Sequence, residues 1–102
     1  MSNKKNPRML GDAELAGVAG HFKLLGEPMR LKILQAVCRG PLTVTGIVAA
    51  AGSTQANVSK HLSLLARAGI LTREKDGQRV YYGLKDPLTL KLCELVHRHF
   101  SS

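Results

Sequence analysis

The sequence predicts one mainly α-helical domain that carries a small β-hairpin. Over most of the 102 residues, apolar side chains recur at the spacing of amphipathic helices. After residue 69 the pattern changes to two short β-like runs, Ile70 to Glu74 and Arg79 to Leu84. They flank Lys75-Asp76-Gly77-Gln78, in which Asp-Gly is a strong signal for a two-residue hairpin turn. The length fits a single domain.

The first two helices are predicted over residues 12–25 and 28–39. In the first, apolar residues fall on one stripe at helical spacing, Asp12 is placed to cap the start, and Gly26 ends the helix. The second opens with Pro28, which suits the first helical position, and has apolar residues almost all round its circumference. A helix of that kind belongs in the middle of the domain.

A short third helix and a longer fourth helix are predicted after the break at Gly40-Pro41. The third, from Thr43 to Ala51, is small and apolar. A three-residue connection, residues 52–54, leads into the fourth, which either Ser53 or Thr54 could cap and which ends before Gly69. These proportions are typical of a helix-turn-helix. The basic hairpin that follows makes the predicted fold a winged helix-turn-helix.

The fourth helix has two faces with different chemistry. One face carries an apolar stripe, formed by Val58, Leu62 and Leu65. The other carries hydrogen-bonding side chains with a single cation in its first turns. Such side chains can bridge base edges in the major groove or bind phosphates. Composition alone would favour an ordinary solvated helix face, but in these surroundings we predict DNA contacts. The residues are Thr54, Gln55, Asn57, Ser59, Lys60 and His61.

The last helix is predicted from Asp86, as capping residue, to Phe100. It shows two apolar stripes, which need two surfaces to cover them. One surface can be the first helix of the same domain, and the other is most economically a second copy of the chain. We therefore predict a homodimer through the first and last helices. The stripes are Leu88, Leu92, Leu95 and Val96, and Leu90, Cys93 and Phe100.

Charge narrows the class of partner. The chain has 15 Lys plus Arg against 7 Asp plus Glu, a net charge of +8, which favours a polyanion such as double-stranded DNA. Two Phe, two Tyr and no Trp are too few to build the aromatic platforms of single-strand RNA binding. Paired carboxylates, a nucleophile with a base and a phosphate loop are all missing, so an enzyme is not expected.

The ends of the chain give a further set of expectations. Residues 1–11 are predicted to be a disordered basic tail, and residues 12–100 the DNA-binding and dimerisation domain. The tail lacks the hydrophobic region of a secretory signal, and no apolar run approaches the length of a membrane span. A cytoplasmic protein without a membrane partner is therefore expected.

Three segments together resemble the ArsR/SmtB family of winged-helix transcriptional repressors: LGEPMRLKIL, ANVSKHLSLLARAGIL and REKDGQRVYYGL. The resemblance implies a dimeric repressor that binds an imperfect palindrome near its own promoter and is released by an inducer. It also implies that Ser59 and His61 contact DNA, with Gln55, Asn57 and Lys60 beside them and Arg79 in the wing. The alternative for His61 is a place at the edge of the core.

The sequence is compatible with more than one kind of inducer. The third helix has no thiol, and Asp86 is followed by Pro87-Leu88, so two metal sites known in the family are absent or half present. The chain resembles members that respond to persulfide or oxidants in having one thiol, Cys38, in the second helix and another, Cys93, in the last. We therefore expect a thiol-reactive inducer and no resident cofactor.

Other readings of the same residues stay possible. Cys93 and His97, at i and i+4, could be soft metal or metalloid ligands, with Glu94 or a partner-chain residue completing the site. Both cysteines could also act only as small buried hydrophobes. A winged helix that serves as a protein-interaction module, without a sensing role, is a further alternative.

Overall fold

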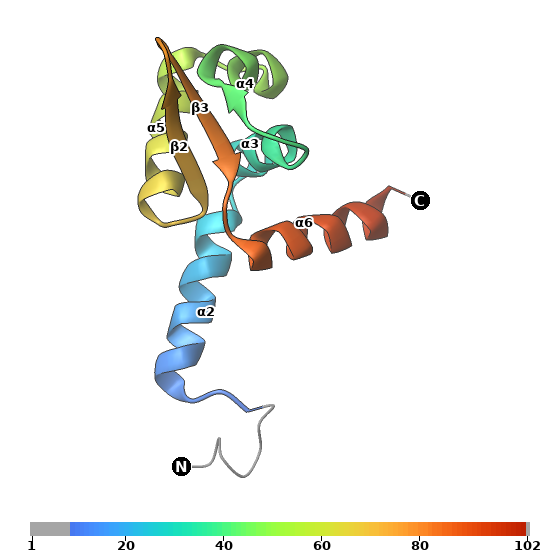
Figure 1. The fold of residues 1–102 in the computed structure, drawn as a ribbon. Coiled ribbons are helices and arrows are strands. Elements are labelled where there is room, and N and C mark those ends of the chain that lie inside the picture. Colours follow the sequence, from blue (N-terminus) through green and yellow to red (C-terminus); the bar gives the residue numbers. More distant parts are fainter. Residues whose placement is uncertain (1–8, 102) are drawn as a thin grey trace.

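The computed structural model describes residues 9–101, so most of the predicted basic tail lies outside the described part of the chain. The predicted helices and hairpin are confirmed (Figure 1). In chain order the elements are α2 (Asp12–Leu25), α3 (Pro28–Val37), β1 (Leu42–Thr43), α4 (Val44–Ala51), α5 (Gln55–Arg67), β2 (Leu71–Asp76), β3 (Arg79–Leu84) and α6 (Pro87–Phe100).

Side-chain caps fix where most of these helices start. Glu27, Thr43, Thr54 and Asp86 each accept a hydrogen bond from a backbone N–H in the first turn of α3, α4, α5 and α6. Helix α2 differs from the prediction. Its N-cap is the glycine before the predicted capping residue, and the carboxylate of Glu14 accepts from that glycine's N–H at 2.7 Å.

The core lies between α3, α4, α5 and the base of the hairpin. Ile33 and Leu34 of α3, Ile47 of α4, and Val58 and Leu62 of α5 have no exposed surface. The all-round apolar helix is thus in the middle of the domain, as predicted. It ends at Val37, two residues earlier than predicted, and Cys38 is its C-cap.

The sheet has a strand that the sequence did not predict. Residues 42–43 form β1, which pairs with β3, so the order is β1-β3-β2 and all pairs are antiparallel. Strand β2 extends to Asp76, which pairs with Arg79, so the two-residue turn is Gly77-Gln78. Gly77 has φ 65°, a left-handed conformation that suits glycine at the first turn position. Of the two tyrosines in β3, Tyr82 is the buried one.

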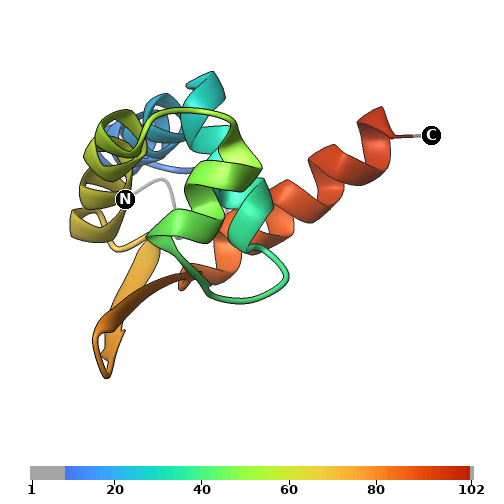
Figure 2. The same ribbon diagram turned by 90° about the horizontal axis from the view of Figure 1, so that it is seen from above.

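Helices α2 and α6 project away from the core (Figure 1), and α6 and the hairpin point in different directions (Figure 2). Within the described chain, the two stripes of α6 divide differently from the prediction. Leu92 and Cys93 pack against the core, and Leu90 is half-buried. The exposed apolar residues of α6 are Leu88, Leu95, Val96 and Phe100.

The two projecting helices meet at one polar contact near the start of α6. His21 Nε2 lies 3.2 Å from the hydroxyl of Thr89, which is fully buried, and 3.6 Å from Asp86 Oδ2. The Thr89 hydroxyl donates to Asp86 Oδ2 at 2.6 Å. This hydrogen bond is the largest of the effects that lower the pKa of Asp86, and the positive charge of His21 adds to them.

Candidate nucleic-acid interface

The start of α5 presents the polar side chains that were predicted to bind DNA. Thr54, Gln55 and Lys60 are exposed, and Asn57 and Ser59 are half-buried. The first N–H groups of a helix have no preceding turn to supply carbonyl acceptors. At the start of α5 a side-chain cap takes the place of one such acceptor. The five side chains are therefore held at the end of a helix whose opposite face is anchored in the core.

Two of these side chains also stabilise the helix start. Thr54 Oγ1 accepts from the backbone N–H of Asn57 at 3.1 Å, and Asn57 Nδ2 donates to Ser53 Oγ at 3.0 Å. By contrast, the side chains of Gln55 and Lys60 make no hydrogen bond within residues 9–101. Their donors and acceptors are available to a partner, as base or phosphate recognition requires.

His61 lies at the edge of the core, the alternative that the sequence left open beside a DNA contact. Its exposed fraction is 7%, and its Nδ1 accepts a hydrogen bond from Nε of Arg30 at 3.2 Å. Arg30 also donates from Nη1 to the carbonyl of Leu24 at 2.8 Å. A guanidinium only donates, so the geometry assigns the unprotonated nitrogen of a neutral imidazole to Nδ1. The alternative at the core edge therefore fits, and Arg30 is a partner that sequence spacing did not reveal.

The hairpin carries its charges on two distinct faces. Successive residues of a strand alternate between faces, and directly opposed residues share one. Leu71 and Tyr82 are buried, so the register places Arg73 and Lys75 on the inner face, toward the helices. Arg79, the wing residue chosen from the sequence, lies on the outer face with Glu74 and Asp76. Strand alternation alone could have separated these two sets.

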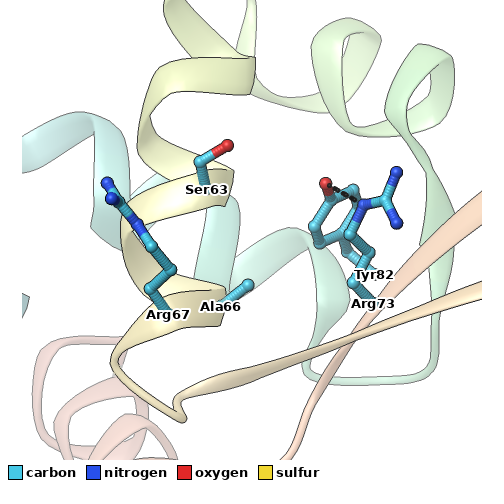
Figure 3. Close-up of a pocket in the computed structure, with 5 residues that line it drawn as sticks. All are labelled: Ser63, Ala66, Arg67, Arg73 and Tyr82. Carbon is cyan, nitrogen blue, oxygen red and sulfur yellow. Dashed lines mark hydrogen bonds between the residues drawn. The ribbon is translucent and has the colours of Figure 1, made fainter.

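Two open hollows lie beside the hairpin. One, of about 430 Å³, separates the hairpin tip from the start of α4 and is lined by Thr45, Gln78 and Arg79 among others. The other, of about 460 Å³, lies between the second half of α5 and the inner face of the hairpin (Figure 3). Its lining residues are Ser63, Ala66, Arg67, Arg73 and Tyr82.

The two cysteines are free and both are half-buried. Cys38 Sγ donates to the carbonyl of Gln35 at 3.1 Å, and Cys93 packs against the core. Burial raises the pKa of the Cys93 thiol, and negative charge on Cys38 and on Glu94 raises it further. Cys38 is the C-cap residue of α3, and Cys93 lies on α6.

The possible metal ligands do not gather into a full site within one chain. Cys93 is half-buried and His97 is exposed on α6. Among the residues that the structure describes, no group of three or more His, Cys, Asp or Glu side chains is placed to hold a metal ion. No helix in residues 9–101 is long and apolar enough to cross a membrane.

A helix-turn-helix followed by a basic hairpin, with polar side chains at the start of its second helix, defines a winged-helix DNA-binding protein. Residues 27–73 match the model of the bacterial regulatory protein, arsR family. The chain is also 35% identical, over 100 residues, to a probable mercury resistance operon repressor of Streptomyces lividans; the match covers 90% of this chain and 80% of that protein. The chain belongs to the ArsR family of transcriptional regulators, whose members are DNA-binding proteins and not enzymes.

Solved structures agree with this assignment. The AntR antimony-specific transcriptional repressor superposes with a TM-score of 0.85 at 35% identity, covering 94% of this chain and 88% of that one. The homodimeric winged helix-turn-helix DNA-binding domain of Mb0332 from Mycobacterium bovis gives 0.74 at 29% identity, covering 88% and 86%. The winged-helix fold is therefore shared with regulators of this family, at least one of which is a homodimer.

Proposed function

We propose that this chain represses transcription as a homodimer that binds a palindromic operator, and that a thiol-reactive signal at Cys38 and Cys93 releases it. In the proposed complex, two α5 helices related by a two-fold axis enter successive major grooves about one helical turn apart. The proposed DNA-contacting residues exclude the buried His61. They are Thr54, Gln55, Asn57, Ser59 and Lys60 of α5 and its cap, and Arg79 of the wing.

The observation that carries the sensing proposal is the placement of two free, half-buried thiols, one at the end of α3 and one on the part of α6 that packs against the core. Negative charge on Cys38 is one of the effects that raise the pKa of the Cys93 thiol. Burial also disfavours the Cys93 thiolate, and the thiolate is the reactive form. In the proposed switch Cys38 reacts first, and Cys93 completes the bridge.

A polysulfide can serve as the oxidant that forms the proposed Cys38–Cys93 disulfide. The thiolate of Cys38 attacks a sulfane sulfur, which forms a cysteine persulfide and expels a shorter sulfide. Cys93, after losing its proton, attacks the Cys38 sulfur of that persulfide and expels hydrosulfide. Two thiols have then lost two protons and two electrons, a Cys38–Cys93 bond has formed, and the sulfane S–S bond has been reduced to sulfide.

The test is fluorescence anisotropy on a duplex from upstream of the gene, with a scrambled duplex at matched salt. We expect specific binding by the reduced protein, loss of binding with polysulfide, and recovery with dithiothreitol. Cys93→Ser should bind DNA normally and stay bound when polysulfide is added, and Cys38→Ser is the matched variant at the other thiol. Normal release by Cys93→Ser would contradict the proposal.

A second candidate is a repressor released by a soft metal or metalloid. It is supported by the relatives, since one is named for mercury resistance and another for antimony. Thiolates are the preferred ligands of soft metals, and Cys93 or Cys38 could supply them together with residues of a second copy. Release by mercury(II) or antimony(III), with no release by polysulfide, would favour this candidate over the thiol switch.

A further inference from the structure

The hollow between α5 and the hairpin is lined by residues of both elements, among them two arginines and two residues with hydroxyl groups. Arg67 and Ser63 come from α5, and Arg73 and Tyr82 come from opposed positions on β2 and β3. Figure 3 shows Ser63 and Ala66 on the helix side of this space and Arg73 and Tyr82 on the hairpin side, while the guanidinium of Arg67 points away from it. The hollow has a volume of about 460 Å³ and opens to the surface.

Arg73 is held in place before any ligand binds. Its Nε donates to the hydroxyl of Tyr82 at 3.1 Å, and Tyr82 is 7% exposed, so the acceptor is fixed in the core. This leaves the two terminal nitrogens of the guanidinium for a partner, since no other hydrogen bond of Arg73 exists within residues 9–101. A guanidinium with a fixed orientation matches the paired oxygens of a phosphate.

The charge around the hollow has one sign. The inner face of the hairpin carries Arg73 and Lys75, while the acidic residues Glu74 and Asp76 lie on the outer face. No carboxylate lines the hollow. The charged residues on the inner face of the hairpin are therefore both cations, whereas the outer face carries Arg79 together with the two acidic residues.

When a winged helix binds DNA, part of the DNA backbone lies between the recognition helix and the hairpin. When the recognition helix lies in a major groove and the wing reaches an adjacent minor groove, one sugar-phosphate strand separates the two grooves. That strand runs between the helix and the wing. We propose that the hollow lined by Arg67, Arg73, Ser63 and Tyr82 binds a backbone phosphate of operator DNA. This rests on the proposed DNA-binding function and adds a contact to it.

The contact would position the protein and carry no sequence information, as phosphate contacts do. Its loss therefore weakens binding to operator and scrambled duplexes by the same factor. It also lowers the salt dependence of binding, because each phosphate contact releases counterions. A dimer repeats the contact, so the effect of one substitution is doubled.

The experiment measures the dissociation constant of the full chain on both duplexes at several salt concentrations. Arg73→Gln should weaken binding about tenfold on both, and should reduce the slope of log K against log salt by about two per dimer. Tyr82→Phe keeps the ring but removes the acceptor that orients Arg73, so binding should weaken by a smaller factor. Thermal unfolding of each variant checks that the fold is intact.

Arg39→Gln is the matched control, because Arg39 is an exposed arginine in the loop after α3 and does not line the hollow. It removes the same charge and should leave the slope within the error of the wild type. A slope for Arg73→Gln equal to that of the control would overturn the phosphate contact. Failure of the wild-type protein to bind duplex DNA with salt dependence would instead refute the DNA-binding function itself.

Discussion

The exposed apolar side chains of α2 allow a quantitative test of the homodimer. Phe22 is 56% exposed in the single chain, although it is a large apolar residue on a helix that projects from the core. A phenylalanine presents about 150 to 250 Å², so roughly 110 Å² of Phe22 remains to be buried. At about 25 cal/mol per Å², that burial is worth about 2.8 kcal/mol per subunit.

We therefore expect Phe22→Ala to weaken the dimer strongly. Alanine keeps part of the apolar contact, so the loss is about 2 kcal/mol per subunit, or about 4 kcal/mol for a two-fold dimer. That corresponds to about a thousandfold increase in the dimer dissociation constant. Operator affinity should fall in parallel at protein concentrations where the variant is monomeric, since each subunit holds only one recognition helix.

Sedimentation equilibrium of the wild type and the variant measures the effect directly. Lys23→Ala is the control, because Lys23 is the exposed neighbour on the same helix and its loss removes little apolar surface. A dissociation constant for Phe22→Ala within about threefold of the wild type would show that α2 is not part of the interface, since the burial estimated above would then not occur.

Three other substitutions test the fold. The pKa of Asp86 is lowered from its ordinary value of 3.8, so the carboxylate stabilises the fold above that pH and this effect is lost as pH falls below about 4. The urea midpoint of Asp86→Asn should therefore change less than that of the wild type between pH 5 and 2. Arg30→Ala should lower the free energy of unfolding by about 1 to 2 kcal/mol in urea titrations, because His61 and the carbonyl of Leu24 lose their donor; no change would make those contacts dispensable. Gly77→Ala should cost about 1 kcal/mol in the same assay, whereas an alanine with unchanged stability would mean that the turn relaxes at no cost.

The sequence predicted the elements whose signals are local. The caps of α3, α5 and α6 lie within three residues of the N–H groups that they accept from, and the stripe of α5 repeats within one helix. Strand β1 has no such signal. Its two residues become a strand only because they pair with Tyr81 and Tyr82, far along the chain. The predicted hairpin was right in position, but the exact turn depended on the pairing of Asp76 with Arg79.

In the candidate site, too, sequence patterns predicted local features but not contacts between distant residues. Gln55 and Lys60 could be chosen from the sequence, because their place on the polar face of α5 follows from helical spacing. The role of His61 could not, because its partner Arg30 is 31 residues away on another helix. The orientation of Arg73 likewise depends on a tyrosine of the opposite strand. Such contacts are fixed by tertiary packing, which periodicity does not encode.

A chain of hydrogen bonds connects α2 and α6 to the recognition helix α5. The carbonyl of Leu24, at the end of α2, accepts from Arg30, and Arg30 donates to His61 of α5. Near the start of α6, the hydroxyl of Thr89 forms a hydrogen bond with His21 of α2. A rotation of α2 or α6 therefore reaches α5 through defined hydrogen bonds.

This connection leads to one expectation for the proposed thiol switch. A Cys38–Cys93 bridge would hold α6 against the end of α3 and change the angle at which α6 meets its copy, and with it the spacing of the two α5 helices. The bridge can shift the equilibrium only as far as it favours one dimer geometry over the other. Crystal structures of the reduced and bridged dimers would measure that spacing. An unchanged separation of the α5 helices would place the effect elsewhere, in a loosening of the DNA-binding domain.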